Sequence, residues 1–359
     1  PYADSLPLCI EEVGLDPPSK NEVLAKIKAV GLCHSDLVAI SGERARPLPM
    51  VIGHEAAGVV EEVGADVEDL ASGDHVAATF VASCGYCSMC REGRPSLCEP
   101  ANIANMSGTL MDGTTRLHRK GSRIHHHSGV AGFAEYAVIS RNALVKIDPS
   151  VPFQHAAMFG CAVITGVGAV FNTAHVSPGQ SVAVVGLGGV GFSSLLAALA
   201  AGAGKVIAVD IQKNKLDLAH ELGAHEVFNA TDKDIISRIR LMTDGGVDLA
   251  VETAGSPQAL ETAFAITRRG GMTVTAGLPG PEATITLQHL SLAGEERCLK
   301  GSYMGSCIPS RDIPRFINLF QDGRLPVDRL MSRSISFGEL NEAFDRLADV
   351  NTIREILVF

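Results

Sequence analysis

The chain has 359 residues, of which 46% are hydrophobic and 19% charged, and its formal net charge is −10. This length suits two domains at about 150 residues each, and the composition excludes a disordered chain. The negative charge and the lack of a basic tract argue against a nucleic-acid partner. No apolar run approaches the roughly 20 residues of a membrane span, and no secretory signal is recognisable, so we expect a cytoplasmic protein that binds no membrane.

The first part of the chain, residues 1 to about 162, is expected to form an irregular β-rich domain. Its short apolar runs are broken by glycine and proline, which is typical of strands joined by turns. The predicted strands are 23–30, 57–63, 75–80 and 133–139. His125, His126 and His127 lie in the same part. Because three adjacent side chains cannot all face one ion, we interpret this tract as a plain loop.

Four cysteines in one short excursion of this domain have the spacing of a zinc site. Four thiolates close a tetrahedron around Zn²⁺ and leave no open position, so such a site is structural. The alternative is unrelated thiols or two disulfides, which the lack of a secretory signal disfavours. The residues are Cys84, Cys87, Cys90 and Cys98.

Three further candidate ligands, Cys33, His54 and Cys161, are dispersed in the same part of the chain. Taken singly, each has an ordinary explanation, as a small core cysteine or a turn histidine, and spacing alone does not decide. Together, two thiolates and one imidazole with an open fourth position are the composition of a catalytic zinc that binds alcohols. Asp36 and Glu55 stand close to these ligands in the sequence, where carboxylates can orient the imidazole and balance charge.

From about 163 to 303 strands alternate with helices, which predicts a six-stranded, doubly wound parallel sheet. The remainder, from about 304 to 359, is expected to return to the first domain and to leave a cleft between the two. The predicted strands of the sheet are 182–185, 206–209, 226–228, 247–251, 272–276 and 299–303, with helices following Gly191 and at 213–222 and 257–267. The remainder is predicted to contain helices 312–320 and 337–347 and a strand at 355–359.

The first strand of that sheet leads into a G-x-G-x-x-G motif that opens a helix. Its members are Gly186, Leu187, Gly188, Gly189, Val190 and Gly191. Glycines at this spacing allow a tight turn, a close approach of a pyrophosphate and close packing of helix on strand. The second strand ends on Asp210, whose carboxylate can accept both ribose hydroxyls and would repel a 2′-phosphate. The stretch therefore predicts a dinucleotide site that prefers NAD over NADP, with Lys213 and Lys215 nearby as the opposing signal.

In their order and spacing these motifs resemble the zinc-dependent medium-chain alcohol dehydrogenases over essentially the whole chain. The resemblance rests on GLCHSD, GHEAAGVVEEVG, the four-cysteine lobe, GLGGVG, VDIQKNK and the closing IREILVF. The long segment 106–129, with MDGTTR and RIHH, is similar to the class I and class III branch. The resemblance implies an α/β chain with a GroES-like β-rich catalytic domain, formed by 1–162 and 304–359 with a structural zinc lobe at 84–98. A Rossmann NAD-binding domain at 163–303 completes the implied architecture.

The resemblance also implies roles for single residues. It raises Cys33, His54 and Cys161 to the catalytic zinc ligands, with Glu55 as an alternate ligand and Asp36 beside them. Ser35 matches a position whose hydroxyl takes the alcohol proton and passes it to the coenzyme ribose. The matched coenzyme positions are His34, Thr165, the six residues of the glycine motif, Asp210, Ile211, Lys215, Ala276, Leu278 and Arg354; the matched pocket positions are Phe80, Leu278 and Tyr303.

Two residues depart from the family's pattern. His34 stands where many relatives carry a pyrophosphate-binding arginine, so we expect a weaker, pH-sensitive grip on the coenzyme. Val38 stands where the animal enzymes carry a histidine that hands the proton to solvent. Since valine cannot do this, we expect the relay to end at the ribose and bound water.

We therefore expect an NAD-dependent alcohol dehydrogenase with two zinc ions per subunit, assembled as a homodimer or a tetramer. Its substrates would be primary or secondary alcohols, including bulky or aromatic ones, because Ser35 is smaller than threonine. The alternative is a thiol-dependent formaldehyde dehydrogenase acting on S-hydroxymethyl-glutathione or -mycothiol, which needs a cationic anchor such as Arg44, Arg46 or Arg116. A non-enzymic derivative of the dinucleotide fold is disfavoured by the intact zinc ligands.

Overall fold

The structure is a computed structural model that describes residues 7–349 and 352–359. The chain divides into two compact units. Unit 1 contains the chain up to Cys161 together with Ile308–Ile317 and Asp328–Phe359, and unit 2 contains Ala162–Cys307 and Asn318–Val327. The short segment Asn318–Val327 belongs to unit 2, although the sequence interpretation grouped it with the first domain.

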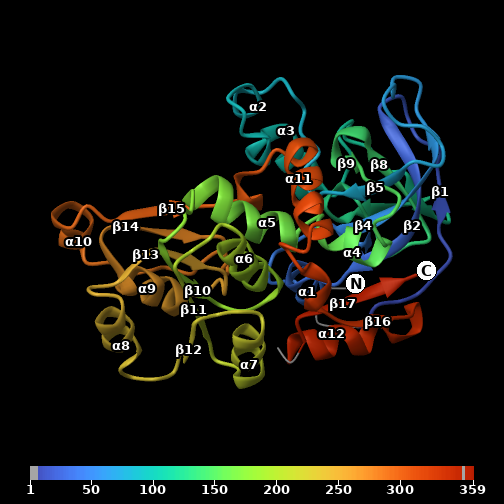
Figure 1. Ribbon diagram of the computed structural model, residues 1–359. Helices are drawn as coiled ribbons and strands as arrows, with labels where there is room; N and C mark the ends of the chain where they lie inside the picture. Colours follow the sequence, from blue (N-terminus) through green and yellow to red (C-terminus); the bar gives the residue numbers. More distant parts are fainter. Residues whose placement is uncertain (1–6, 350–351) are drawn as a thin grey trace. The chain divides into compact units, whose positions relative to one another are not determined.

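Unit 2 is built on a six-stranded sheet in the order β12-β11-β10-β13-β14-β15, with every pair parallel (Figure 1). This confirms the predicted doubly wound sheet. The strands are β10 (Ser181–Val185), β11 (Lys205–Asp210), β12 (Glu226–Asn229), β13 (Val247–Glu252), β14 (Thr267–Thr275) and β15 (Cys298–Gly301). The helices are α5 (Ala162–Gly168), α6 (Gly189–Ala200), α7 (Lys213–Glu221), α8 (Ile235–Met242), α9 (Pro257–Ile266) and α10 (His289–Gly294).

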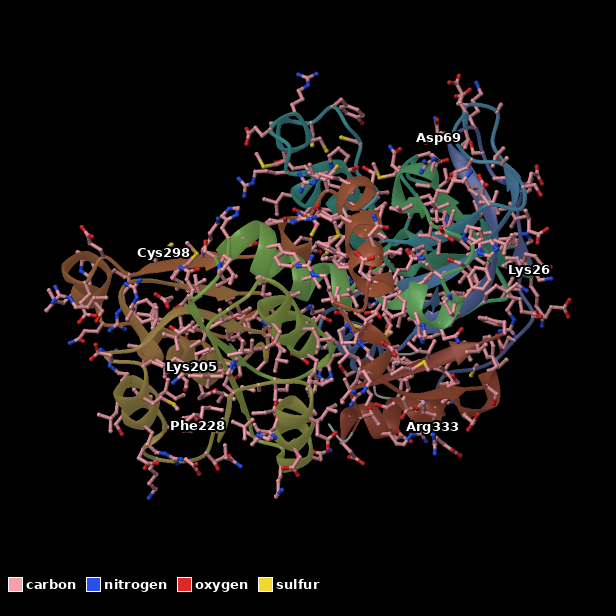
Figure 2. All side chains as sticks on the ribbon, viewed as in Figure 1. Lys26, Asp69, Lys205, Phe228, Cys298 and Arg333 are labelled. Carbon is pink, nitrogen blue, oxygen red and sulfur yellow. The ribbon has the colours of Figure 1, made fainter. Side chains whose placement is uncertain are left out.

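The central strands of this sheet are largely buried on both faces, as their mostly apolar runs predict. Ala183 and Val185 of β10 pack with Ile239 of α8 and Ile266 of α9 in one core cluster. Helix α10 lies beyond the starting ends of strands β14 and β15 (Figure 1). β15 is an edge strand of the sheet, and its Cys298 is exposed (Figure 2).

Unit 1 contains a larger sheet in the order β16-β17-β2-β4-β5-β9, in which β8 also pairs with β2, and a smaller sheet in the order β1-β6-β7-β3. The larger sheet consists of β2 (Glu22–Gly31), β4 (Glu55–Val63), β5 (His75–Ala78), β8 (Tyr136–Ser140), β9 (Leu144–Lys146), β16 (Met331–Ile335) and β17 (Arg354–Val358). The smaller sheet consists of β1 (Gly14–Leu15), β3 (Met50–Val51), β6 (Leu117–Arg119) and β7 (Ser122–His126). The α-helices of unit 1 are α1 (His34–Ser41), α2 (Ser88–Arg91), α3 (Glu99–Ser107), α4 (Phe153–Met158) and α12 (Leu340–Ala348), while α11 (Pro309–Gln321) begins in unit 1 and ends in unit 2.

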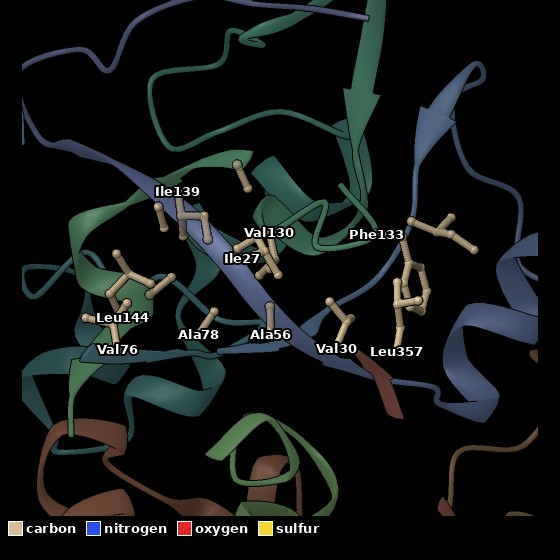
Figure 3. Packing of buried hydrophobic residues seen from close by; sticks show 14 of the residues in the cluster. Ile27, Val30, Ala56, Val76, Ala78, Val130, Phe133, Ile139, Leu144 and Leu357 are labelled. Carbon is tan, nitrogen blue, oxygen red and sulfur yellow. The ribbon is translucent and has the colours of Figure 1, made fainter. Parts of the chain in front are cut away.

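The core of unit 1 gathers around the long strand β2 (Figure 3). Ile27 and Val30 of this strand pack with Phe133 and Ile139, which follow much later in the chain, and with Leu357 of β17. Their side chains are almost completely buried. Because β17 lies next to β2 in the sheet, the last strand of the chain helps to position the residues that follow β2.

The structure differs from the prediction in a few places. The histidine tract is not a plain loop, and that interpretation is wrong: His125 and His126 end strand β7, and His127 begins the 3₁₀ turn η2 (His127–Gly129). β14 begins at Thr267, five residues before the predicted start, because Thr267 pairs with Val247 ahead of a register shift. The strand predicted at 133–139 is β8, from Tyr136 to Ser140.

Within residues 7–349 and 352–359, no helix is both long enough and apolar enough to cross a membrane. No disulfide joins any of the cysteines in the same part of the chain.

Candidate active site

Four metal-binding side chains of unit 1 meet in one buried cluster. The Sγ atoms of Cys33 and Cys161, a ring nitrogen of His54 and a carboxylate oxygen of Glu55 all lie within 4.8 Å of one another. Cys33 precedes helix α1, Glu55 opens strand β4, and Cys161 follows helix α4. The structure thus brings together the three dispersed ligands that the sequence singled out, with Glu55 beside them.

Backbone hydrogen bonds hold Cys33 at the end of β2. The N–H of Leu32 donates to the carbonyl of Glu355 on β17 at 3.0 Å. The N–H of Cys33 donates to Asp36 Oδ2 at 3.1 Å, which satisfies one of the free donors at the start of α1. A Cβ on Gly31 would collide with Glu55 Oε2, so a larger residue at this position would displace the Glu55 carboxylate.

The two thiols of the cluster shift each other's pKa in opposite directions. A hydrogen bond from the Cys161 thiol, opposed by burial, holds the pKa of Cys33 well below its ordinary value. The same bond to Cys33, together with burial, raises the pKa of Cys161 well above its ordinary value. The surroundings therefore favour a thiolate on Cys33 over one on Cys161, and a bound cation would stabilise thiolates on both residues.

Asp36 orients the imidazole of the cluster. Its Oδ1 lies 3.0 Å from His54 Nδ1 and also accepts the backbone N–H of Gly53 at 3.1 Å. Although burial acts against it, the neighbouring carboxylate raises the pKa of His54 well above its ordinary value. Because Nδ1 is engaged with Asp36, the other ring nitrogen, Nε2, is the one available to a metal.

Glu55 is paired with a buried arginine. Arg354 Nη2 lies 3.0 Å from Glu55 Oε1, and Arg354 Nη1 donates to the carbonyl of Leu32 at 2.6 Å. Burial raises the pKa of Glu55 to about 7, while the Arg354 charge lowers it. Within the described residues, neither carboxylate oxygen of Glu55 accepts a well-aligned hydrogen bond.

This donor set fits a zinc ion. Two thiols and an imidazole are the soft and borderline ligands that Zn²⁺ takes, and their closeness in a dry interior costs free energy unless a cation compensates the thiolates. The buried Glu55 oxygens without an aligned donor are also consistent with a missing cation. With Glu55 held by Arg354, three protein ligands and one open position are the composition that remains.

The four-cysteine lobe forms a second cluster. The thiols of Cys84, Cys87, Cys90 and Cys98 lie within 4.8 Å of one another, around the short helix α2. The backbone N–H of Cys87 donates to Cys84 Sγ at 3.3 Å and that of Cys84 to Cys98 Sγ at 3.2 Å. Such N–H···S bonds stabilise thiolates, so this lobe also fits a tetrahedral zinc.

The glycine motif of unit 2 forms the turn between β10 and α6. Gly186 has φ +95°, a left-handed conformation that favours glycine, and a Cβ on Gly191 would collide with the Gly186 carbonyl. Nothing lies within 4 Å of a Cβ placed on Gly188, which leaves this backbone open to a ligand. Asp210 ends β11, and its Oδ2 accepts the Leu187 N–H at 2.6 Å.

The other predicted coenzyme and pocket residues differ in exposure. Thr165 and Lys215 are buried, and burial lowers the pKa of Lys215. Ile211, Leu278 and Tyr303 of unit 2 are exposed, Ala276 is half-buried, and in unit 1 His34 is exposed and Ser35 half-buried. The half-buried Phe80 of unit 1 packs its ring against His54, with centroids 5.9 Å apart. Arg354, predicted at the pyrophosphate, is instead buried against Glu55 and Leu32, so its coenzyme role stays a prediction.

Sequence reasoning missed His127. Its Nδ1 lies 3.0 Å from the same Asp36 Oδ1 that His54 contacts. The histidine tract was noticed, but Asp36 is 91 residues away in the chain, and no local pattern connects the two.

Two cysteine clusters that fit zinc, together with a parallel sheet and a glycine-rich turn, are the features of a zinc-binding dehydrogenase. Residues 19–149 match the model of the alcohol dehydrogenase GroES-like domain, and residues 189–322 match that of the zinc-binding dehydrogenases.

Solved structures extend this likeness to nearly the whole chain. An alcohol dehydrogenase zinc-binding domain protein from Burkholderia ambifaria is 36% identical with a TM-score of 0.96, over 99% of this chain and 96% of that one. Benzyl alcohol dehydrogenase from Acinetobacter calcoaceticus is 33% identical with a TM-score of 0.95, over 99% and 97%. A putative zinc-binding dehydrogenase from Sinorhizobium meliloti 1021, bound to NADP, is 26% identical with a TM-score of 0.81, over 97% and 94%.

The chain belongs to the zinc-dependent medium-chain alcohol dehydrogenase family, and it is an oxidoreductase of that family. This confirms the predicted family and the predicted combination of a GroES-like unit with a Rossmann-like parallel sheet.

Proposed function

We propose that this protein is an NAD-dependent dehydrogenase that reversibly oxidises alcohols, with a preference for bulky or aromatic ones. The observation that carries the proposal is the buried cluster of Cys33, His54 and Cys161, beside which Glu55 is paired with Arg354. A zinc ion bound there would act as a Lewis acid on the oxygen of the alcohol or of the carbonyl product.

The residues around the cluster take the remaining roles. Asp36 fixes the tautomer of His54. Ser35, in the first turn of α1, would accept the alcohol proton and pass it on. Val38 of the same helix has no group that titrates, so the proton would leave through the coenzyme ribose and water.

For the coenzyme, Asp210 supports NAD. Its oxygens accept the backbone N–H groups of Leu187 and Gln212, at 2.6 and 2.9 Å, which orients the carboxylate at the end of β11. Each carboxylate oxygen has a second lone pair that can accept a ribose hydroxyl, whereas a 2′-phosphate would meet a like charge. The S. meliloti relative bound to NADP shows that the choice between the two coenzymes must be measured here.

For the substrate, the named relative is a benzyl alcohol dehydrogenase, and the edge of the Phe80 ring beside His54 offers an aromatic contact. The thiol-dependent alternative receives less support. Arg116, one of its candidate anchors, is bound by Glu22 and Asp112 and is mostly buried.

The assembly and the setting of the enzyme are part of the proposal. β15 ends the sheet of unit 2, and its exposed Cys298 and Gly301 leave that edge accessible for pairing with a second copy in a homodimer.

The thiols of two zinc clusters require a reducing compartment, which favours the cytoplasm.

The test is the formation of reduced nicotinamide with purified, zinc-loaded protein. NAD and NADP are each paired with ethanol, a secondary alcohol and benzyl alcohol, and with formaldehyde premixed with glutathione or mycothiol. We expect the highest kcat/KM with NAD and benzyl alcohol. Turnover confined to the thiol adducts would replace the proposal with the formaldehyde dehydrogenase alternative, and no turnover with any alcohol or any thiol adduct would reject both.

A further inference from the structure

Two histidines from distant segments share one carboxylate oxygen beside the zinc cluster. Asp36 is completely buried, and its Oδ1 lies 3.0 Å from Nδ1 of His54 and 3.0 Å from Nδ1 of His127. The N–H of Gly53 also donates to Oδ1, and the N–H of Cys33 donates to Oδ2. The Asp36 carboxylate therefore has four hydrogen-bonding partners, and two of these belong to Cys33 and His54 of the zinc cluster.

The chemistry of these contacts assigns both imidazole tautomers. An ionised carboxylate only accepts hydrogen bonds, so His54 and His127 must each carry a proton on Nδ1. The same protons account for the closeness of the three side chains without any cation among them. With Nδ1 protonated, Nε2 is the ring nitrogen of His54 that can offer a lone pair to zinc.

His127 is held firmly in this position. Its side chain is only 5% exposed, and its ring meets the His54 ring edge to face, with centroids 5.3 Å apart and an interplanar angle of 86°. Ser128 and Ala131, which follow it, have φ values of +53° and +56°. Non-glycine residues adopt this left-handed backbone at a cost, so the surrounding structure must compensate for the conformation of this turn.

We propose that His127 is a positioning residue for the zinc ligand His54, acting through Asp36. By occupying one acceptor site of Oδ1, His127 fixes the carboxylate in the orientation that receives the His54 N–H. This inference rests on the proposed zinc site of Cys33, His54 and Cys161, and it adds His127 to the residues that orient the ligand His54.

Three variants at this position separate the role from general packing. His127→Asn keeps a donor where Nδ1 stands, His127→Gln moves the donor to the place of Nε2, and His127→Phe keeps the ring and removes the donor. His126→Gln is the matched control, because His126 is equally buried but uses Nε2 to accept the Arg116 N–H. Gln retains that acceptor.

The first measurement is the zinc retained per chain after dialysis against graded chelator. Loss of such an outer contact typically weakens metal binding about 10- to 100-fold. We therefore expect the Phe and Gln variants to lose one zinc ion at a free chelator concentration roughly 10- to 100-fold lower than wild type does. For the Asn variant and the His126 control, this chelator concentration should stay within about twofold of the wild-type value. The zinc of the four-cysteine lobe should be retained in all of them.

The second measurement is the visible spectrum of protein whose catalytic zinc is replaced by cobalt. We expect the spectrum to change with Phe and Gln but not with Asn. Equal behaviour of Asn and Gln, or wild-type retention in the Phe variant, would overturn the role of His127. If wild-type protein binds one zinc ion per chain, and only at the four-cysteine lobe, the proposed zinc site of Cys33, His54 and Cys161 is wrong. The number of zinc ions bound by wild type therefore distinguishes failure of the proposed site from failure of the role of His127.

Discussion

Replacing Asp210 by asparagine should change the coenzyme preference of the enzyme. Asparagine has almost the same shape and keeps one oxygen that can accept the Leu187 N–H, while the Gln212 N–H loses its acceptor, so the turn after β10 should survive with one hydrogen bond fewer. The variant loses the negative charge and a charge-assisted bond to the ribose, worth about 1.5–3 kcal/mol. At a tenfold change for each 1.4 kcal/mol, kcat/KM for NAD should fall roughly 10- to 150-fold.

The same change removes the repulsion that a 2′-phosphate would meet. Two like charges about 4 Å apart repel by up to about 4 kcal/mol at the edge of a protein, so kcat/KM for NADP should rise at least about tenfold. Steady-state kinetics with both coenzymes at a fixed alcohol concentration measure the ratio. Asp217→Asn is the control, because Asp217 is an exposed carboxylate on α7 that pairs with Lys213. If the NAD to NADP ratio of the Asp210 variant stays within about twofold of wild type, the carboxylate does not select the coenzyme and the reasoning fails.

Three further predictions concern other parts of the chain. Burial lowers the pKa of His126 to about 4, whereas the pKa in the unfolded chain is about 6.5. Because the unfolded chain binds the proton more readily, neutral His126 contributes fully to the free energy of unfolding above pH 6.5, and this contribution is lost as the pH falls toward 4. Between pH 7.5 and 5, the unfolding free energy of wild type should fall by about 2 kcal/mol more than that of His126→Gln, measured with urea; equal pH dependence would contradict this. Ser35→Ala should lower kcat by about 100-fold and Ser35→Thr should restore it; an alanine variant with wild-type kcat would remove Ser35 from the proton path. Cys87→Ser should reduce the bound zinc from two ions to one per chain and lower the melting temperature, and retention of both ions, measured by elemental analysis, would argue against a structural lobe.

The parts of the fold that local patterns encode could be predicted from the sequence. The run from Val182 to Val185 is apolar, with three valines, and leads into a glycine motif, so the sequence predicts the strand, the turn and the helix. The four lobe cysteines are near one another in the chain, and their spacing alone indicated the cluster that the structure shows.

What could not be predicted depends on contacts between distant residues. Arg354 was matched to a coenzyme role by its closing motif, but nothing in that motif reveals that it lies beside Glu55. His127 could not be connected with Asp36, since only the folded sheets of unit 1 bring η2 to α1. The early start of β14 likewise follows from its pairing with Val247, not from the polar residues at its beginning.

The discontinuous composition of unit 1 has a consequence for the order of events on the ribosome. The ligands Cys33, His54 and Cys161 are synthesised early, but strand β17, which pairs with β2 and carries Arg354, emerges only after the main segment of unit 2. Until then the Leu32 N–H lacks the Glu355 carbonyl and Glu55 lacks its guanidinium partner. During this time the thiols of Cys33 and Cys161 lack their final surroundings, whereas the main segment of unit 2 is already synthesised and can begin to fold. The cluster of Cys33, His54 and Cys161 therefore acquires its final surroundings only after β17 has been synthesised, so a metal ion bound there would be enclosed late.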